Sequence, residues 1–129
     1  MEYTCYSLKA GNLKNLQQKS GLLAALGPQE VSVKVKSIGL NFADVFAIWG
    51  LYSATPKGEF TPGLEFAGEV VAIGKEVTQV SLGDRVMGVT RFGGYSTALN
   101  SDQRYLIPLP ADWSYPEGAA YLVQVLTAY

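Results

Sequence analysis

The sequence contains no histidine, and this absence removes more chemistry than any other feature of its composition. Imidazole is the commonest general base in enzymes and the usual partner of a nucleophilic serine or cysteine. With a single cysteine, Cys5, the chain also lacks the ligands of a structural zinc site. Any reaction must therefore use carboxylates, hydroxyls, amides, lysine, arginine or a bound cofactor.

Long apolar runs and an excess of one charge are also missing. Apolar stretches such as residues 22–26 are far shorter than the roughly 18 residues of a membrane-spanning helix. Lys+Arg total 10 and Asp+Glu 11, which leaves no electrostatic footprint for nucleic acid or an anionic membrane. One cysteine cannot form an internal disulfide, and the first residues do not resemble a secretory signal. We therefore expect a cytoplasmic protein with no membrane span and no nucleic-acid partner.

Glycine and proline, by contrast, occur along the whole chain and divide it into short elements. The 129 residues include 14 glycines and 6 prolines, a pattern that favours a β-rich domain over a helical bundle. Residues 31–38 alternate apolar and polar side chains and form the clearest strand, with Val31, Val33 and Val35 on one face. Residues 13–26 fit either a helix or a loop with a strand. Further strands are expected at residues 3–8, 64–73, 85–89, 95–99 and 105–107, with an extended piece at 77–82.

Two helices are predicted from their terminal signals. Asn41 suits an N-cap and Gly50 a helix end, so residues 41–50 are predicted to be helical. Ser114 and Glu117 form a capping-box pattern before a second, apolar helix over residues 118–129. That helix has no closing glycine. We therefore expect residues 1–113 to form one domain and residues 114–129 to begin a helix that leads to another.

Six strings in a fixed order resemble one protein family. The set is far more specific than any single string; it comprises residues 38–44, 50–52, 62–70, 71–74, 83–86 and 117–129. It resembles the N-terminal, GroES-like catalytic domain of the medium-chain dehydrogenase/reductase superfamily, which is alcohol dehydrogenase-like. The most similar branch is the zinc-independent quinone oxidoreductases, including VAT-1-like proteins. The resemblance implies a mainly β fold, a GroES-like partly open antiparallel β-barrel with short helices that ends in the start of an interdomain helix.

The departures from the superfamily pattern concern metal and cofactor. Zinc alcohol dehydrogenases of this superfamily have a cysteine at the position of Asn41 and a histidine at that of Leu64. Their four-cysteine zinc lobe is absent between residues 89 and 94. No Gly-x-Gly-x-x-Gly string occurs either, so NADPH would be bound mainly by a Rossmann domain absent from this chain. We expect NADPH as the cofactor and no zinc.

The resemblance implies a function for a longer, full-length protein. It implies NADPH-dependent hydride transfer to small-molecule quinones or α,β-unsaturated carbonyls, with a homodimer as a possible assembly. The 129-residue chain alone is predicted to be inactive. Two alternatives stay open: an enoyl reductase domain of a polyketide or fatty-acid synthase, and a non-enzymatic binding or scaffold module.

The candidate catalytic residues are Asn41, Asp44 and Tyr52. Asn41 replaces the family's zinc cysteine, so its amide could donate to a substrate carbonyl or to the nicotinamide ribose, and it also suits a helix N-cap. Asp44 is either a first-turn acid stabilised by the helix dipole or a support for the pocket. Tyr52 either donates a proton or hydrogen bond to substrate or cofactor, or packs a loop. Glu65 is interpreted as a structural acid that pairs with Arg85.

The remaining candidates are expected to bind ligand without reacting. The resemblance places Thr127 near the nicotinamide, although a mid-helix threonine can also bond its own backbone, and Gln124 shares its helix face. Phe46 is expected in the substrate pocket, where some quinone reductases have a tyrosine. Arg91 is expected at the pocket rim.

Overall fold

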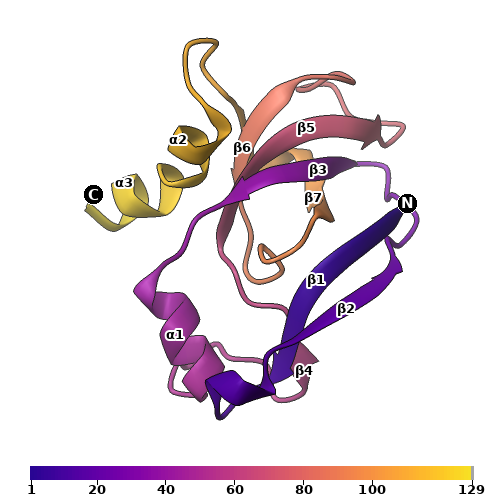
Figure 1. Ribbon diagram of the computed structural model, residues 1–129. Coiled ribbons are helices and arrows are strands. Elements are labelled where there is room, and N and C mark those ends of the chain that lie inside the picture. The colour runs from indigo at the N-terminus through magenta and orange to yellow at the C-terminus, as the bar shows by residue number, and fades with distance from the viewer. Residues whose placement is uncertain (129) are drawn as a thin grey trace.

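Two antiparallel sheets, not closed into a barrel, dominate the computed structural model, which describes residues 1–128 (Figure 1). The smaller sheet has the order β2-β1-β4, with β1 at Glu2–Lys9, β2 at Gln17–Leu22 and β4 at Glu59–Phe60. The larger has the order β7-β3-β5-β6-β8, and its strands are β3 Glu30–Ile38, β5 Glu65–Ile73, β6 Arg85–Val89, β7 Ala98–Asp102 and β8 Leu106–Pro108. The predicted fold class, mainly β and partly open, is confirmed.

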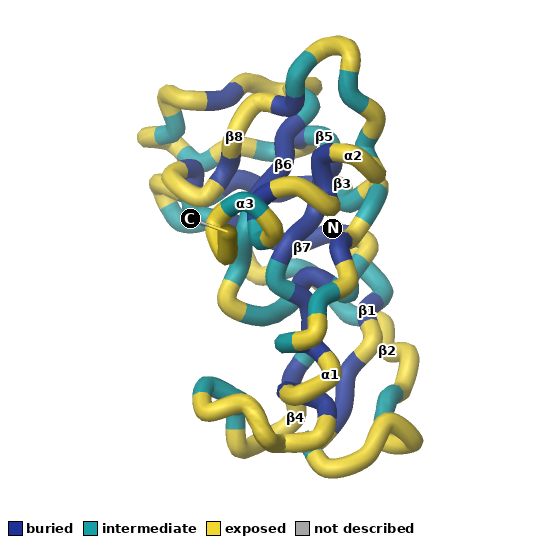
Figure 2. Tube along the Cα trace, turned by 90° about the vertical axis from the view of Figure 1, so that its left-hand side faces the viewer, coloured by how far each residue is buried: buried dark blue, intermediate teal, exposed yellow. Residues whose placement is uncertain are grey.

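The core lies on the larger sheet, where the alternation of residues 31–38 has its predicted effect. Val31 and Val33 are fully buried, and β3 pairs with β5 on one side and β7 on the other. In Figure 2 many residues of β3, β5 and β6 are coloured as buried. The main cluster consists of Val31, Val33, Phe66, Val70, Val80, Val86, Leu99 and Leu106.

The two sheets are joined by the segment just before β7. A strand was predicted at residues 95–99, but β7 begins at Ala98. The preceding residues pair with β1 instead: Tyr6 N–H donates to Tyr95 O at 3.0 Å and Thr97 N–H to Thr4 O at 2.8 Å. Residues 77–82 form a loop rather than a strand. Residues 13–26 contain a short 3₁₀ helix, Leu13–Asn15, followed by β2.

Helix α1, Phe42–Trp49, is confirmed together with both of its predicted ends. Asn41 is extended at the N-cap, and Gly50 ends the helix in the left-handed region at φ 78°. Ala47 and Ile48 of α1 pack with Leu8 and Phe60 of the smaller sheet. The helix therefore belongs to a satellite core separate from that of the larger sheet.

The prediction of a single C-terminal helix over residues 118–129 is wrong, because two short helices with a turn between them stand there. Helix α2, Tyr115–Ala119, begins at the predicted Ser114 capping box, and α3 covers Leu122–Ala128. The break follows from the Val123 N–H, which in a continuous helix would bond to the carbonyl of Ala119. It donates instead to the Glu65 carboxylate at 3.2 Å. The part of the prediction that concerns Tyr129 lies outside the described residues.

Helices are short throughout the described residues. A second 3₁₀ helix, Gln103–Tyr105, links β7 to β8. Within residues 1–128, no helix has both the length and the hydropathy needed to cross a membrane.

Candidate functional site

A buried carboxylate joins the start of α1 to the start of α3. Asn41 Nδ2 donates to Glu65 Oε2 at 2.8 Å, and the Val123 N–H donates to Glu65 Oε1 at 3.2 Å. Glu65 itself is only 1% exposed, at the first residue of β5. Both helices lie on the side of the molecule that faces the viewer in Figure 2. Glu65 therefore fixes the position of the Asn41 side chain relative to the C-terminal helix.

A second buried carboxylate, Asp44, holds the backbone of the same helix start. Its Oδ2 accepts the Asn41 N–H at 3.0 Å and the Tyr95 hydroxyl at 2.8 Å, while its buried Oδ1 has no partner among the described residues. Burial raises the pKa of Asp44, and the hydrogen bonds from Tyr95 and Asn41 oppose that rise. Burial and the neighbouring Asp44 raise the pKa of Tyr95, so the phenol keeps its proton and remains a donor. This burial favours a supporting role for Asp44 over contact with a ligand.

The predicted pairing of Glu65 with Arg85 is wrong. In the β5–β6 register Arg85 lies opposite Glu69, four residues along the strand from Glu65, a separation of about 13 Å. The Arg85 guanidinium donates to Trp113 O at 2.7 Å and lies 4.7 Å from the ring centre of Tyr115. It therefore holds the segment before α2.

Gly39 provides the space in which Glu65 sits. A Cβ at this position would lie 2.3 Å from Ala119 O and 2.5 Å from Glu65 Cγ, and the Gly39 N–H donates to Glu65 O at 3.1 Å. Such separations are impossible for real atoms, and one of the two neighbours is backbone. The end of α2, the Glu65 side chain and the strand that leads into α1 can therefore meet only at a glycine.

The other end of α1 is apolar and partly open. Tyr52 packs edge-on against Phe92, with ring centres 6.4 Å apart, and its backbone N–H donates to Phe46 O at 3.3 Å. Tyr52 also lines a hollow of about 420 Å³ together with Leu51 and Lys57. Phe46 is half exposed and Arg91 is exposed, so this group of side chains is accessible to a ligand.

The candidate residues thus fall into two groups at the two ends of α1. Asn41 and Asp44 meet at its start, next to α3, where Gln124 and Thr127 are both exposed. Tyr52 lies just beyond its end, where it contacts the segment that contains Arg91, and Phe46 lies in the middle of the helix. The eight residues of α1, about 12 Å of helix, separate Asn41 from Tyr52, so these two side chains would contact different parts of a bound molecule.

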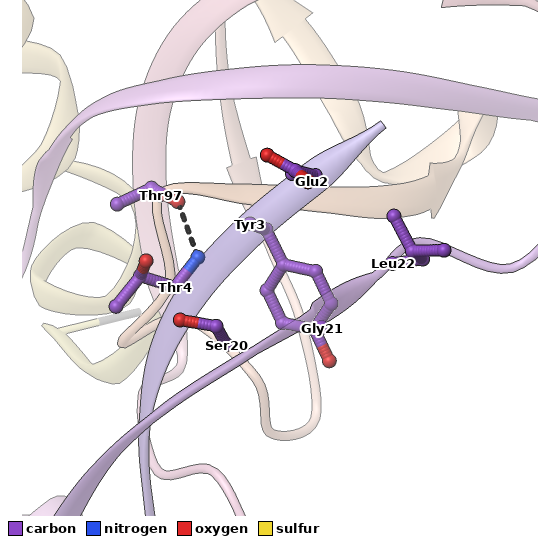
Figure 3. Close-up of a pocket in the computed structure, with 7 residues that line it drawn as sticks. All are labelled: Glu2, Tyr3, Thr4, Ser20, Gly21, Leu22 and Thr97. Carbon is purple, nitrogen blue, oxygen red and sulfur yellow. Dashed lines mark hydrogen bonds between the residues drawn. The ribbon is translucent and has the colours of Figure 1, made fainter.

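A separate hollow of about 590 Å³ contains none of the candidate residues. It lies between β1, β2 and Thr97, where the Thr4 N–H donates to the Thr97 hydroxyl at 2.8 Å (Figure 3). Its lining offers a threonine pair, Ser20 and one carboxylate, Glu2, but no buried titratable group. The chemistry of the chain therefore points to α1 and not to this hollow.

Sequence reasoning missed Tyr95 and the Val123 N–H, the two groups that complete the buried network. Tyr95 follows a glycine pair that predicts only a turn, and a backbone N–H leaves no mark on the sequence at all. The one available signal was a glutamate at the start of a largely apolar strand, which requires buried donors if the side chain is buried.

The chain matches known proteins over most of its length. Residues 27–111 match the alcohol dehydrogenase GroES-like domain. Over 114 residues, 88% of the chain, it is 39% identical to the synaptic vesicle membrane protein VAT-1 homolog of Rattus norvegicus. Over 103 residues, 80% of the chain, it is 42% identical to quinone oxidoreductase-like protein 2 of Mus musculus. The chain spans only 28% and 29% of these two relatives.

The fold of the chain also matches that of solved structures. The crystal structure of Escherichia coli quinone oxidoreductase complexed with NADPH superimposes with a TM-score of 0.90 and 32% identity, covering 98% of this chain and 39% of that one. The matched region includes α1, both sheets and the segment that supplies Glu65. By sequence and by fold, the chain belongs to the alcohol dehydrogenase GroES-like domain family.

Proposed function

We propose that this chain is the catalytic domain of an NADPH-dependent, zinc-independent oxidoreductase that reduces quinones or α,β-unsaturated carbonyls. The observation that carries the proposal is the likeness, over nearly the whole chain, to a quinone oxidoreductase that binds NADPH. The proposal concerns the longer protein, because the chain spans less than a third of its curated relatives. We place that protein in the cytoplasm and propose a homodimer as its assembly.

The residues at the start of α1 suit the stabilisation of a developing oxyanion. Reduction of a quinone or enone places negative charge on a carbonyl oxygen, which a fixed donor stabilises. Asn41 is half buried, and one of its two amide hydrogens is directed at Glu65, which leaves the other for a ligand. We assign that second hydrogen to the substrate carbonyl or to the cofactor ribose.

The exposed polar groups of α3 suit the nicotinamide end of NADPH. Gln124 and Thr127 lie one turn apart on the exposed side of α3, and Glu65 holds the start of this helix next to Asn41. A bound NADPH would supply the hydride. Asn41, Gln124 and Thr127 would orient the nicotinamide of NADPH. A further domain, reached from residues 114–129, would bind the pyrophosphate of the cofactor.

The far end of α1 suits an apolar, planar substrate. Tyr52 and Phe92 form an aromatic wall, the half-exposed Phe46 accepts the Tyr52 N–H through its carbonyl, and the exposed Arg91 precedes Phe92 in the chain. Tyr52 is 38% exposed and its hydroxyl makes no hydrogen bond within residues 1–128, so it is available to donate to a ligand. In this arrangement the wall positions the substrate and Asn41 polarises it.

The test is an assay of the full-length protein that carries this domain. NADPH oxidation would be followed with 1,4-benzoquinone, with a simple enone and with an enoyl thioester, each with and without a chelator. We expect turnover with the quinone or the enone that a chelator does not reduce. Turnover of the thioester alone favours the enoyl reductase alternative, and no turnover together with no NADPH binding favours a non-enzymatic module.

Asn41→Ser provides the matched variant. Serine retains N-cap preference, so the fold should survive, but its short side chain cannot present a donor at the position of Nδ2. We expect kcat to fall by about 100-fold, because removal of one oxyanion donor costs at least that much in other enzymes. Unchanged kcat in a folded Asn41→Ser protein would exclude Asn41 as the donor.

A further inference from the structure

We infer that Glu65 is a positioning residue: its buried carboxylate determines which way the Asn41 amide faces and ties that amide to the start of α3. The catalytic consequence of this inference rests on the proposed function. The orientation of the amide does not, and it can be measured whether or not the protein reduces quinones.

The chemistry of the contact allows only one orientation. A carboxylate whose two oxygens each receive an N–H acts only as an acceptor, and an asparagine amide has a donor end and an acceptor end of similar shape. Only Nδ2 can therefore face Glu65 Oε2 at 2.8 Å. The amide is fixed, and its second hydrogen points to a constant place.

Hydrogen bonds from Asn41 and Val123 compensate for the burial of the Glu65 carboxylate. Within residues 1–128 no lysine or arginine forms an ion pair with Glu65, although its side chain is fully buried. A buried charge needs hydrogen bonds, and each of its oxygens receives one, from Asn41 and from the Val123 N–H. Val123 lies in the first turn of α3, where a backbone N–H has no partner within the helix and is free to donate to the carboxylate.

The backbone around Glu65 prevents it from moving away. The Gly39 N–H holds the Glu65 carbonyl, and the Gly39 Cα lies against both the Glu65 side chain and Ala119 O. A shift of α3 would therefore be transmitted to Asn41 through a single carboxylate. The amide that we assign to the ligand is coupled in this way to α3.

Glu65→Gln is the decisive substitution because it preserves shape. Asn41 and Val123 bond to different oxygens of Glu65, so a glutamine in the same position accepts from one of them and turns its amino group toward the other. The double variant Asn41→Asp/Glu65→Gln reverses the pair: the new amide at position 65 donates to the new carboxylate at position 41 and still accepts from Val123. This double variant retains both contacts but removes the donor that faces the ligand.

The experiment uses the full-length protein labelled with ¹⁵N-asparagine. The Asn41 side-chain resonances are those lost in Asn41→Ser. In the unmodified protein we expect one strongly downfield amide proton, which bonds to the carboxylate, and we expect this asymmetry to disappear in Glu65→Gln. An Asn41 side-chain spectrum that Glu65→Gln leaves unchanged would refute the inference, whatever the enzymatic activity.

The kinetic measurements separate positioning from folding. We expect Glu65→Gln to lower kcat about tenfold while KM changes by less than about twofold. The reversed pair should recover the unfolding midpoint of the unmodified protein but not its kcat. Recovery of kcat by the reversed pair would show that Glu65 is merely structural. If the unmodified protein has no activity, the proposed function fails and the NMR result alone decides the orientation.

Discussion

The two ends of helix α1 are built on different principles. Its start is polar and buried: Asn41 is held by Glu65 and Asp44, and Asp44 by Tyr95, at distances of 2.8 to 3.0 Å. Its end is aromatic and half exposed, with Tyr52 against Phe92 at 6.4 Å. Hydrogen bonds weaken steeply with distance and angle, whereas edge-on aromatic contacts tolerate a wide range of geometries.

The difference suggests a division of labour within one helix. A donor that must meet a developing charge has to be fixed before the reaction, and the start of α1 provides that rigidity. A surface that binds apolar rings has to accommodate different outlines, and the end of α1 provides that tolerance. Changes at the start should therefore be costly and specific, and changes at the end should be mild.

Gly39→Ala should have the largest effect on stability. The added Cβ would lie 2.3 Å from Ala119 O and 2.5 Å from Glu65 Cγ, and the first of these neighbours is backbone. We expect the free energy of unfolding to fall by about 3 kcal/mol, at the upper end for overpacking. Urea unfolding followed by tryptophan fluorescence measures this change.

Gly58→Ala is the matched control for Gly39→Ala. Gly58 has an ordinary φ and no atom within 4 Å of an added Cβ. We expect no loss of stability, or a gain of about 0.5 kcal/mol from a less flexible unfolded chain. Equal losses in the two variants would contradict the close approach that defines the start of α1.

Asp44→Ala should cost about 2 kcal/mol, because it removes a charged acceptor from two donors, the Asn41 N–H and the Tyr95 hydroxyl. Tyr95→Phe should cost about 1 kcal/mol, because it removes only one of these bonds. The double variant should lose less than the sum of the two, since both single changes break the same contact. Strict additivity would mean that the Tyr95 bond contributes nothing.

Asp44→Asn should become relatively more stable as pH rises. Burial raises the pKa of the Asp44 carboxyl above its ordinary value, so the folded protein holds this proton more tightly than the unfolded chain. The stability that this carboxyl contributes is fully present at low pH and is lost as pH rises through the folded pKa. The free energy of unfolding of both proteins is measured between about pH 3 and pH 7. As pH rises over this range, the value for Asp44→Asn should increase relative to that of the unmodified protein. A difference independent of pH would contradict the direction of the shift.

The same contrast explains what could be predicted from the sequence. The strand at residues 31–38, the two ends of α1 and the Ser114 capping box follow from neighbours within a few residues, and all are confirmed. The break between α2 and α3 was not predicted, because it depends on Glu65, 58 residues before Val123. The prediction that Glu65 pairs with Arg85 was wrong for a related reason: the pairing depends on strand register between distant segments, which places Arg85 opposite Glu69.

Phe92→Leu tests the aromatic end of the helix and should have a moderate effect. Leucine keeps most of the buried volume but loses the edge-on contacts with Phe60 at 5.4 Å and Tyr52 at 6.4 Å. We expect a loss of about 1 kcal/mol in urea unfolding. Tyr105→Leu is the control, because Tyr105 is an exposed aromatic, and it should change stability by less than about 0.5 kcal/mol.

Tyr52→Phe should have the smallest effect on stability and so separates folding from function. The ring that packs against Phe92 is retained, and the lost hydroxyl belongs to an exposed side chain and makes no hydrogen bond within residues 1–128, so the free energy of unfolding should change by less than about 0.5 kcal/mol. If the hydroxyl binds substrate, KM for the quinone should rise with little change in kcat, because such a contact is made equally in the ground and transition states. Asn41→Ser should do the reverse, lowering kcat with little change in KM. If both variants lowered kcat alike, the two ends of α1 would act on the same step, and the division of labour between them would be wrong.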